Sequence, residues 1–139
     1  MLIIVTITTL AVIFSIGLHY AALLSTTKLL THFHGTHPLS IVLALFLAVI
    51  AHLMEILIFA IAWQFMFSIE LITFSIPSPT FLDLLYFSGT TYTTIGYGDI
   101  ILTSNGRIMA VVEGVMGLVL IAWTASFTYY EMNRKWIKK

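Results

Sequence analysis

Three stretches of the sequence are apolar and long enough to cross a lipid bilayer: residues 2–24, 39–67 and 107–130. A transmembrane helix needs about 20 predominantly apolar residues, and a helix satisfies its own backbone hydrogen bonds where water is absent. The chain of 139 residues is 60% hydrophobic and 9% charged, whereas soluble domains contain about 25% charged residues. The sequence therefore predicts an all-α integral membrane protein.

The first apolar stretch is preceded only by Met1. A secretory signal peptide has a positively charged region before its apolar core and a small-residue cleavage site after it. We therefore interpret residues 2–24 as a retained transmembrane helix, with a helix lying on the membrane surface as the alternative.

Residues 25–38 form a polar connector that contains His32, His34 and His37. Imidazoles bind transition metals, so this cluster is a candidate metal site. The connector contains no cysteine or carboxylate, and histidines in a solvated loop become positively charged on acidification. A solvated loop is therefore the preferred interpretation of the connector.

A short helix is predicted between the second and third apolar stretches. Residues 68–78 are interpreted as a linker, and Thr80 followed by Asp83 matches the capping-box pattern of a helix N-terminus. The predicted helix, residues 80–91, is too short to span the membrane, so we interpret it as re-entrant. Irregular backbone at this depth requires surrounding protein or a water-filled cavity.

The segment that follows, residues 93–99, has the sequence Thr-Thr-Ile-Gly-Tyr-Gly-Asp. Neighbouring carbonyls of an extended strand point to opposite sides. A backbone that aims them all one way must alternate between right- and left-handed conformations, and glycine adopts the left-handed one without the penalty of a Cβ. Gly96 and Gly98 occupy alternate positions, and the Thr94 hydroxyl adds an acceptor. The pattern indicates a row of oxygens that replaces the water shell of a cation.

This segment resembles the T-x-G-Y-G-D selectivity filter of potassium channels, in which four identical loops surround K⁺. Residues 39–130 resemble the pore unit of that family, here with one extra N-terminal transmembrane helix, as in a small prokaryotic-type channel. The parts implied by the resemblance are an outer helix (39–67), a pore helix (80–91), a filter (93–99) and an inner helix (107–130).

The resemblance implies a passive, K⁺-selective channel formed by a homotetramer in the lipid bilayer, with K⁺ as permeant ligand and no cofactor. Because one chain supplies one filter strand, four chains are needed to surround an ion. The filter residues implied to bind K⁺ are Thr94, Ile95, Gly96, Tyr97 and Gly98. The carbonyls of the first four and the Thr94 hydroxyl are the implied ligand atoms.

The residues implied to support the filter are Thr93, Asp99, Thr90 and Glu113. Some members of the family have a glutamate where this sequence has Thr90, and two tryptophans where it has Tyr86 and Phe87. These departures imply a filter that is braced differently. We expect Glu113 to accept hydrogen bonds from Thr90 or Thr91 behind the filter.

Three ionisable side chains fall inside apolar stretches: His52, Glu55 and Glu113. A charge at membrane depth costs roughly 2.5–3.5 kcal/mol on insertion scales, so these groups are expected to face protein or water. His52 and Glu55 are three residues apart and share a helix face. A bracing network and a protonation-linked control of the filter are both compatible with this pattern.

Gly117 lies ten residues after Arg107, the position of the inner-helix gating hinge in the resembling family. Glycine weakens a helix and permits bending, but small residues such as Ala110 and Gly114 also favour close helix packing. If Gly117 is the hinge, the cavity below the filter is lined by Leu118, Ile121 and Ala125.

Basic residues determine the expected orientation. Residues 131–139 contain four of them: Arg134, Lys135, Lys138 and Lys139. The positive-inside rule therefore places this tail in the cytoplasm and the N-terminus outside a plasma membrane. Before Arg107 the chain has one basic residue, Lys28, so it has no charged voltage-sensor helix. An aromatic belt at the outer surface is indicated by Trp63, Phe65 and Phe67.

Alternative functions differ from the leading one in recognisable features. A weakly selective cation channel and a non-conducting modulatory subunit remain open alternatives, although Tyr97 and the intact filter favour selective conduction. Ion-coupled transporters with related loops have four non-identical loops in one chain, and this chain has one. The formal net charge is zero, which gives no electrostatic reason for nucleic-acid binding. No nucleophile lies near His52 and Glu55, so an enzyme is not predicted.

Overall fold

The computed structural model of the chain describes residues 1–32, 39–103 and 105–136. Within these ranges the chain forms four α-helices: α1 (Leu2–His32), α2 (Leu39–Ser68), α3 (Phe81–Tyr92) and α4 (Arg107–Trp136). Three segments of the described chain are long and apolar enough to cross a membrane: Leu2–Leu30, Leu39–Ser68 and Arg107–Arg134. The predicted all-α fold, with three long apolar helices and one short helix, is confirmed.

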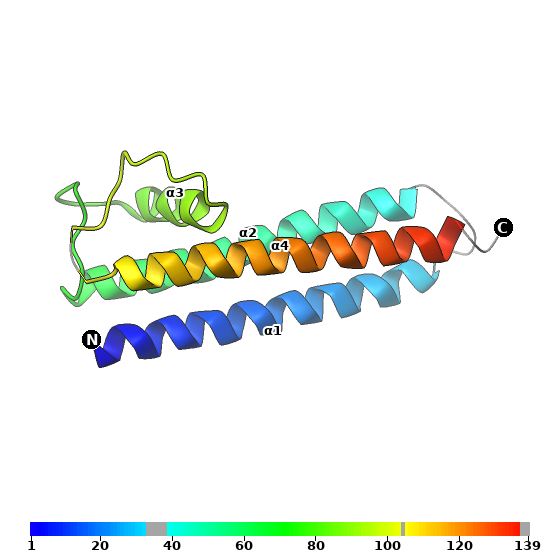
Figure 1. Cartoon of the computed structure of the whole chain (residues 1–139), viewed down its shortest axis with the longest axis horizontal. Coiled ribbons are helices and arrows are strands. Elements are labelled where there is room, and N and C mark those ends of the chain that lie inside the picture. Colours follow the sequence, from blue (N-terminus) through cyan, green and yellow to red (C-terminus); the bar gives the residue numbers. More distant parts are fainter. Residues whose placement is uncertain (33–38, 104, 137–139) are drawn as a thin grey trace.

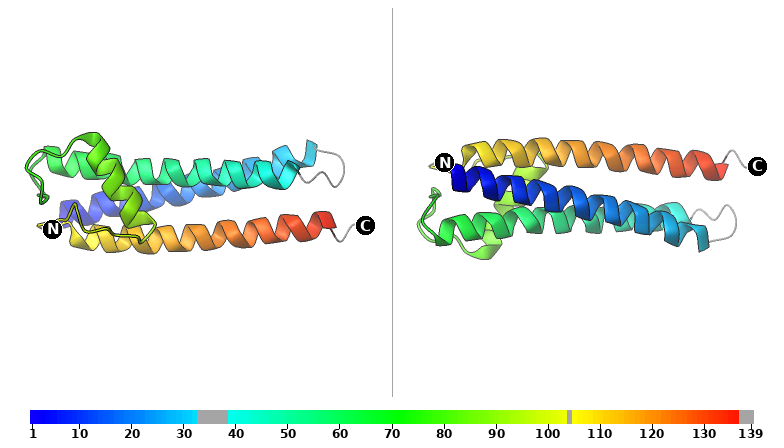
Figure 2. Two further views of the ribbon diagram at one scale, coloured as in Figure 1. Left: turned by 90° about the horizontal axis from the view of Figure 1, so that it is seen from above. Right: turned by 90° about the horizontal axis from the view of Figure 1, so that it is seen from below.

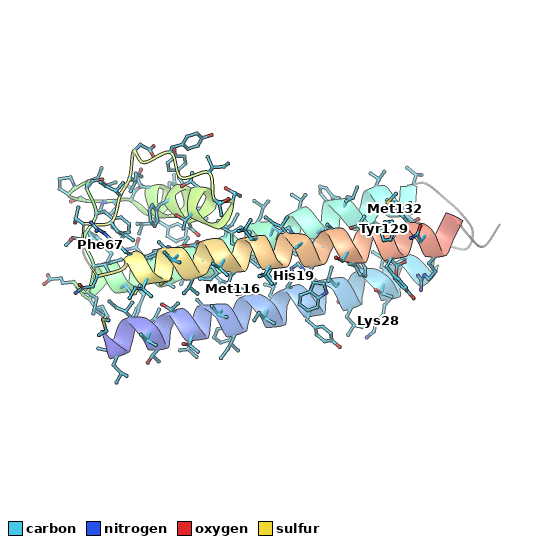
Figure 3. The ribbon with its side chains drawn as sticks, viewed as in Figure 1. His19, Lys28, Phe67, Met116, Tyr129 and Met132 are labelled. Carbon is cyan, nitrogen blue, oxygen red and sulfur yellow. The ribbon has the colours of Figure 1, made fainter. Side chains whose placement is uncertain are left out.

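The three long helices lie side by side along the length of the molecule, with α1 and α4 running in one direction and α2 in the other (Figure 1). The short helix α3 lies on one side of α2 and α4, and α1 packs against the same two helices from the opposite side (Figure 2). The N-terminus of α1 and the whole of α3 lie at one end of the molecule, and α4 ends at the other. The side chains along these helices are drawn in Figure 3.

Two of the long helices extend further than the sequence predicted. α1 continues beyond residue 24, and polar side chains in this extension bond within the helix: the Thr27 hydroxyl donates to the Leu23 carbonyl at 3.0 Å. Leu30 is buried, which anchors this extension against the bundle. α4 continues beyond residue 130, where Arg134 and the buried Glu131 form an ion pair at 2.8 Å. The connector and the basic tail are therefore partly helical.

The predicted capping box begins α3. The Thr80 backbone N–H donates to the Asp83 carboxylate at 2.7 Å, and the Asp83 N–H donates to the Thr80 hydroxyl at 3.3 Å. Hydrogen bonds from the side chain and then the backbone of Thr80 hold the pKa of Asp83 below its ordinary value. Both backbone donors are satisfied, which fixes the start of the helix.

The chain before α3 pairs with the chain after the 93–99 segment. The Ser75 N–H donates to the Ile101 carbonyl at 2.9 Å, and the Thr103 N–H donates to the Thr73 carbonyl at 3.0 Å. An isolated antiparallel bridge lies between these two hydrogen bonds. No pattern in the sequence predicts this pairing, which holds the two ends of the loop together.

The core beside α3 is aromatic. The rings of Trp63 and Phe87 meet edge to face with centroids 5.4 Å apart, and Phe74 meets Phe87 in the same way at 5.3 Å. Trp63 is 0% exposed, so its assignment to an aromatic belt is wrong. The buried indole N–H has a partner inside the protein, the Glu113 carboxylate, and so does not need the membrane interface.

Candidate functional site

The backbone of residues 93–99 is left-handed at alternate positions. Thr94, Gly96 and Gly98 have φ angles of 60°, 52° and 78°. The two glycines adopt this conformation as their residue type allows. Thr94 does so although it is β-branched, which costs on the order of 1–3 kcal/mol unless surrounding structure imposes it. The sequence pattern did not reveal this third position.

Backbone hydrogen bonds tie the start of the segment to the last turn of α3. The Thr94 N–H donates to the Thr91 carbonyl at 3.0 Å, and the Gly96 N–H donates to the Thr90 carbonyl at 3.1 Å. Within the single chain all seven residues of the 93–99 segment are exposed. The segment is therefore anchored at one end and presents its face away from its own helices.

Tyr86 connects α3 to the other end of the segment. Its hydroxyl donates to the Asp99 carboxylate at 2.8 Å, and its ring stacks on Tyr97 with centroids 6.4 Å apart and planes 3° from parallel. The hydrogen bond to Asp99 raises the pKa of Tyr86 above its ordinary value. Tyr86 thus links α3 to both Tyr97 and Asp99 of the segment.

Glu113 joins three helices behind the segment. Its carboxylate accepts hydrogen bonds from Trp63 Nε1 of α2 at 2.7 Å and from the Ser88 hydroxyl of α3 at 2.5 Å. The expectation that Thr90 or Thr91 would be the donor is wrong. The Thr90 hydroxyl donates to a carbonyl of its own helix at 3.0 Å, whereas Ser88 lies fully buried on the face toward α4.

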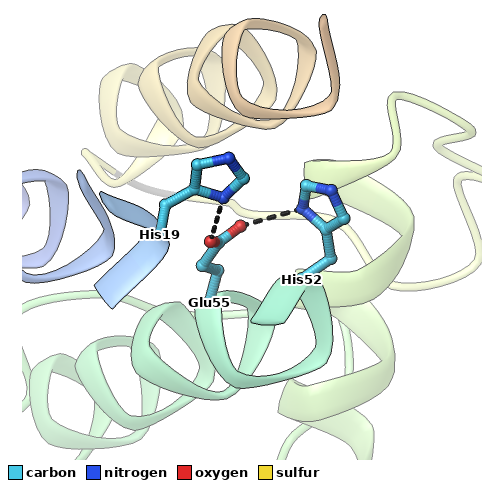
Figure 4. A group of neighbouring side chains, drawn as sticks. All are labelled: His19, His52 and Glu55. Carbon is cyan, nitrogen blue, oxygen red and sulfur yellow. Dashed lines mark hydrogen bonds and ion pairs between the residues drawn. The ribbon is translucent and has the colours of Figure 1, made fainter. Parts of the chain in front are cut away.

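A second polar cluster lies deeper in the bundle, and Figure 4 shows three of its members, His19, His52 and Glu55. His19 Nδ1 of α1 lies 2.8 Å from one oxygen of Glu55, and His52 Nδ1 lies 3.0 Å from the other. Tyr92, the last residue of α3, donates its hydroxyl to the same carboxylate. Thr124 of α4 lies 3.0 Å from His52 Nε2. All four helices meet at this cluster.

The shared face of His52 and Glu55 was predicted, but His19 was not identified as their partner. The signal was present, since a histidine in an otherwise uncharged transmembrane stretch requires a polar partner inside the protein. The predicted cluster of connector histidines cannot be compared with the structure. The side chains of His32, His34 and His37 lie outside the described part of the chain, and their metal binding stays a prediction.

Gly117 lies directly against the end of α3. A Cβ added there would stand 1.9 Å from the Tyr92 carbonyl oxygen, so only glycine permits this approach. Close packing therefore accounts for the residue, and bending at Gly117 stays a prediction. Leu118 and Ile121 are exposed within the single chain, as is Ala125, and Leu118 borders a hollow that also includes Thr94.

A short helix held between two membrane-length helices, followed by an oxygen-rich segment with alternating backbone handedness, defines a membrane pore protein. The sequence profile of the ion channel family matches residues 51–130. These residues are more than half of the chain, which therefore belongs to this family of multi-pass membrane proteins.

Protein LctB of Geobacillus stearothermophilus is 34% identical to the chain over 53 residues. The match covers 38% of this chain and 40% of that protein, so the chain matches less than half of its relative's length. No solved structure matches the chain.

Proposed function

We propose that the chain is one subunit of a passive, K⁺-selective channel in which four copies surround a central pore. The observation that carries the proposal is the backbone of residues 93–99, which is left-handed at three alternate positions. Such a backbone can present successive carbonyl oxygens to one ion path, where they replace the hydration shell of K⁺. The proposed ligands are the carbonyls of Thr94, Ile95, Gly96 and Tyr97 and the Thr94 hydroxyl.

The electrostatics of α3 support cation binding at this position. The helix ends at Tyr92, immediately before the segment. The C-terminal end of a helix has a partial negative charge, which favours a cation within about one turn. Asp99 adds a carboxylate at the far end of the segment.

Exposure of the segment supports assembly from several copies. Ile95 is 56% exposed and Tyr97 is 69% exposed within one chain, although both are large and apolar or aromatic. One segment also leaves most of an ion uncovered. Four copies arranged around an axis would bury these side chains and complete the coordination shell.

In the proposed orientation α4 ends in the cytoplasm of the cell and the 93–99 segment opens on the outside, as the positive-inside rule requires of the basic tail. Gly117 is then proposed as a hinge in α4. The proposed cavity lining below the segment consists of Leu118, Ile121 and Ala125, and the segment is proposed to be supported by Thr93, Thr90, Asp99 and Glu113.

The experiment is ion flux in liposomes that contain the purified full chain, under K⁺ and then Na⁺ gradients, with Ba²⁺ as blocker. We expect K⁺ flux that Ba²⁺ inhibits and much weaker Na⁺ flux. Equal K⁺ and Na⁺ flux would instead indicate a weakly selective channel. No flux from a folded tetramer, across pH and voltage, would indicate a non-conducting subunit.

Two alanine variants test the backbone of the segment. Gly96 has a φ of +52° and no atom of its own chain within 4 Å of an added Cβ, so within one chain Gly96→Ala acts on backbone conformation and not through a clash. Gly89→Ala in α3 is the control, because its Cβ makes an ordinary contact of 3.9 Å with Ile56. We expect Gly96→Ala to abolish selective K⁺ flux and Gly89→Ala to retain it. Selective flux through both variants would refute the role of the backbone.

A further inference from the structure

The buried cluster of His19, His52, Glu55, Tyr92 and Thr124 has no role in the proposed coordination of K⁺. It lies inside the bundle, and its members come from all four helices. His19 and Glu55 are fully buried, while 17% of the His52 side chain remains exposed and offers a path to the cluster. Buried ionisable groups in a membrane are expected to serve a function or to be paired with one another.

The ligand-type atoms of three of these residues converge. His19, His52 and Glu55 each offer one nitrogen or oxygen, and these atoms all lie within 4.8 Å of one another. Ligands of a tetrahedral Zn²⁺ at 2.0–2.1 Å from the metal stand roughly 3.3 Å apart. His19 Nδ1 lies 2.8 Å from one Glu55 oxygen and His52 Nδ1 lies 3.0 Å from the other, both slightly closer than that spacing. Small side-chain adjustments would therefore open a space for one ion.

The chemical composition of the cluster also fits a transition metal. Two imidazoles and one carboxylate form a donor set that Zn²⁺ uses in proteins, and the carboxylate offsets part of the charge of the ion. The Tyr92 hydroxyl contacts both His52 and Glu55, so a further polar group borders these three ligands. The described part of the chain thus supplies three candidate ligands and a neighbouring hydroxyl.

The Nε2 atoms of His19 and His52 provide independent support for a metal on the Nδ1 side of both rings. The Thr124 hydroxyl lies 3.0 Å from His52 Nε2 and 3.4 Å from His19 Nε2. A hydroxyl has two lone pairs but only one proton. If both neutral rings keep their protons on Nδ1, facing Glu55, this single proton cannot satisfy both Nε2 atoms. A metal on the Nδ1 side shifts both ring protons to Nε2, and the two lone pairs of Thr124 can then accept both.

We propose that His19, His52 and Glu55 bind one divalent transition-metal ion per chain, with Zn²⁺ as the probe, and that Thr124 orients both imidazoles. A ligating histidine commonly donates its second ring N–H to such an outer partner, and loss of that partner weakens binding. The site is distinct from the connector histidines at residues 32–37. A bound ion would join α1 to α2, beside the end of α3 and the middle of α4. The competing account is a metal-free cluster in which one protonated imidazole pairs with Glu55.

The test uses the purified full chain, stripped with EDTA and titrated with Zn²⁺ by calorimetry. We expect one ion per chain. Glu55→Gln and His19→Asn should each lower the affinity at least about tenfold, and Thr124→Val about 10- to 100-fold. The matched control replaces His32, His34 and His37 with Ala and should bind Zn²⁺ as the wild type does.

A second measurement identifies the ligand atoms without any change at His19, His52 or Glu55. Zinc X-ray absorption on the control variant should show about two imidazole nitrogens among roughly four ligands at the distances of a tetrahedral site. Three outcomes would overturn the proposal: no stoichiometric binding by the folded wild type, undiminished binding by folded Glu55→Gln and His19→Asn, or loss of binding in the connector variant. The first of these outcomes would favour the metal-free ion pair.

Discussion

Replacing Gly117 with alanine should force α4 away from the end of α3. The added Cβ would lie 1.9 Å from the Tyr92 carbonyl oxygen and 2.8 Å from its carbonyl carbon. Ordinary contact begins at 3.4 Å, so the separation must grow by 3.4 − 1.9 = 1.5 Å. The obstacle is backbone, which cannot rotate away as a flexible side chain can.

Two opposing effects determine how Gly117→Ala changes the free energy of unfolding. Overpacking a filled site typically costs about 1–3 kcal/mol, and the upper part of that range applies because neither helix backbone yields easily. Alanine in a helix interior regains about 1 kcal/mol relative to glycine. We therefore expect Gly117→Ala to lower the free energy of unfolding by about 2 kcal/mol.

The assay is reversible unfolding of the purified protein in mixed detergent micelles, followed by circular dichroism. Gly17→Ala is the matched control, since no atom lies within 4 Å of its added Cβ and the same propensity gain applies. The control should be neutral or more stable than the wild type. If Gly117→Ala unfolds at the same detergent concentration as Gly17→Ala, the packing of α4 against Tyr92 is not as described.

Three further changes have defined expectations. Trp63→Phe leaves the buried Glu113 carboxylate without one donor and should lower the free energy of unfolding by about 1–3 kcal/mol in the same assay. Tyr86→Phe removes the hydrogen bond to Asp99 and should change the free energy of unfolding by less than about 1 kcal/mol. The same variant should show reduced K⁺-selective flux. Capping hydrogen bonds lower the pKa of Asp83 in the folded state. The stability that Asp83 contributes to the fold is therefore complete above its unfolded pKa of 3.8, and it is lost as the pH falls through the lower folded pKa. Asp83→Asn should therefore weaken the dependence of stability on pH below about 4, measured by thermal unfolding.

Each of these three predictions would be contradicted by a defined result. Equal stability of Trp63→Phe and wild type would mean that another donor reaches the carboxylate. Unchanged flux through Tyr86→Phe would remove Tyr86 from the support of the segment. An identical acid dependence in Asp83→Asn and wild type would show that the capping box does not contribute to the stability of the folded protein.

Features that depend on local chemistry were predictable from the sequence. Apolar length determined the three long helices, and the Thr80 and Asp83 pattern located the start of α3. Gly96 and Gly98 correctly indicated two of the left-handed positions. These predictions succeed because residue type and spacing alone restrict the backbone.

Features that depend on tertiary contacts were not predictable in the same way. Ser88 could be chosen over Thr90 as the partner of Glu113 only once the rotation of α3 against α4 was known. His19 is separated from Glu55 by 36 positions in the chain, and no local pattern pairs them. Thr94 is likewise left-handed although a β-branched residue does not favour that conformation, and its N–H donates to the Thr91 carbonyl.

The pairing of Thr73 and Ser75 with Ile101 and Thr103 makes residues 73–103 a closed insert between two long helices. Because its two ends are already hydrogen-bonded to each other, the insert enters and leaves the bundle at one point, as exchangeable inserted units do. Transfer of this unit into another pore of the family would require matching side chains where α3 touches α2 and α4, and also where Phe74 packs against Trp63 and Phe67 of α2. Recombination at its two paired ends would therefore move the 93–99 segment together with the short helix that anchors it, into a host whose inner helix has a glycine at the position of Gly117.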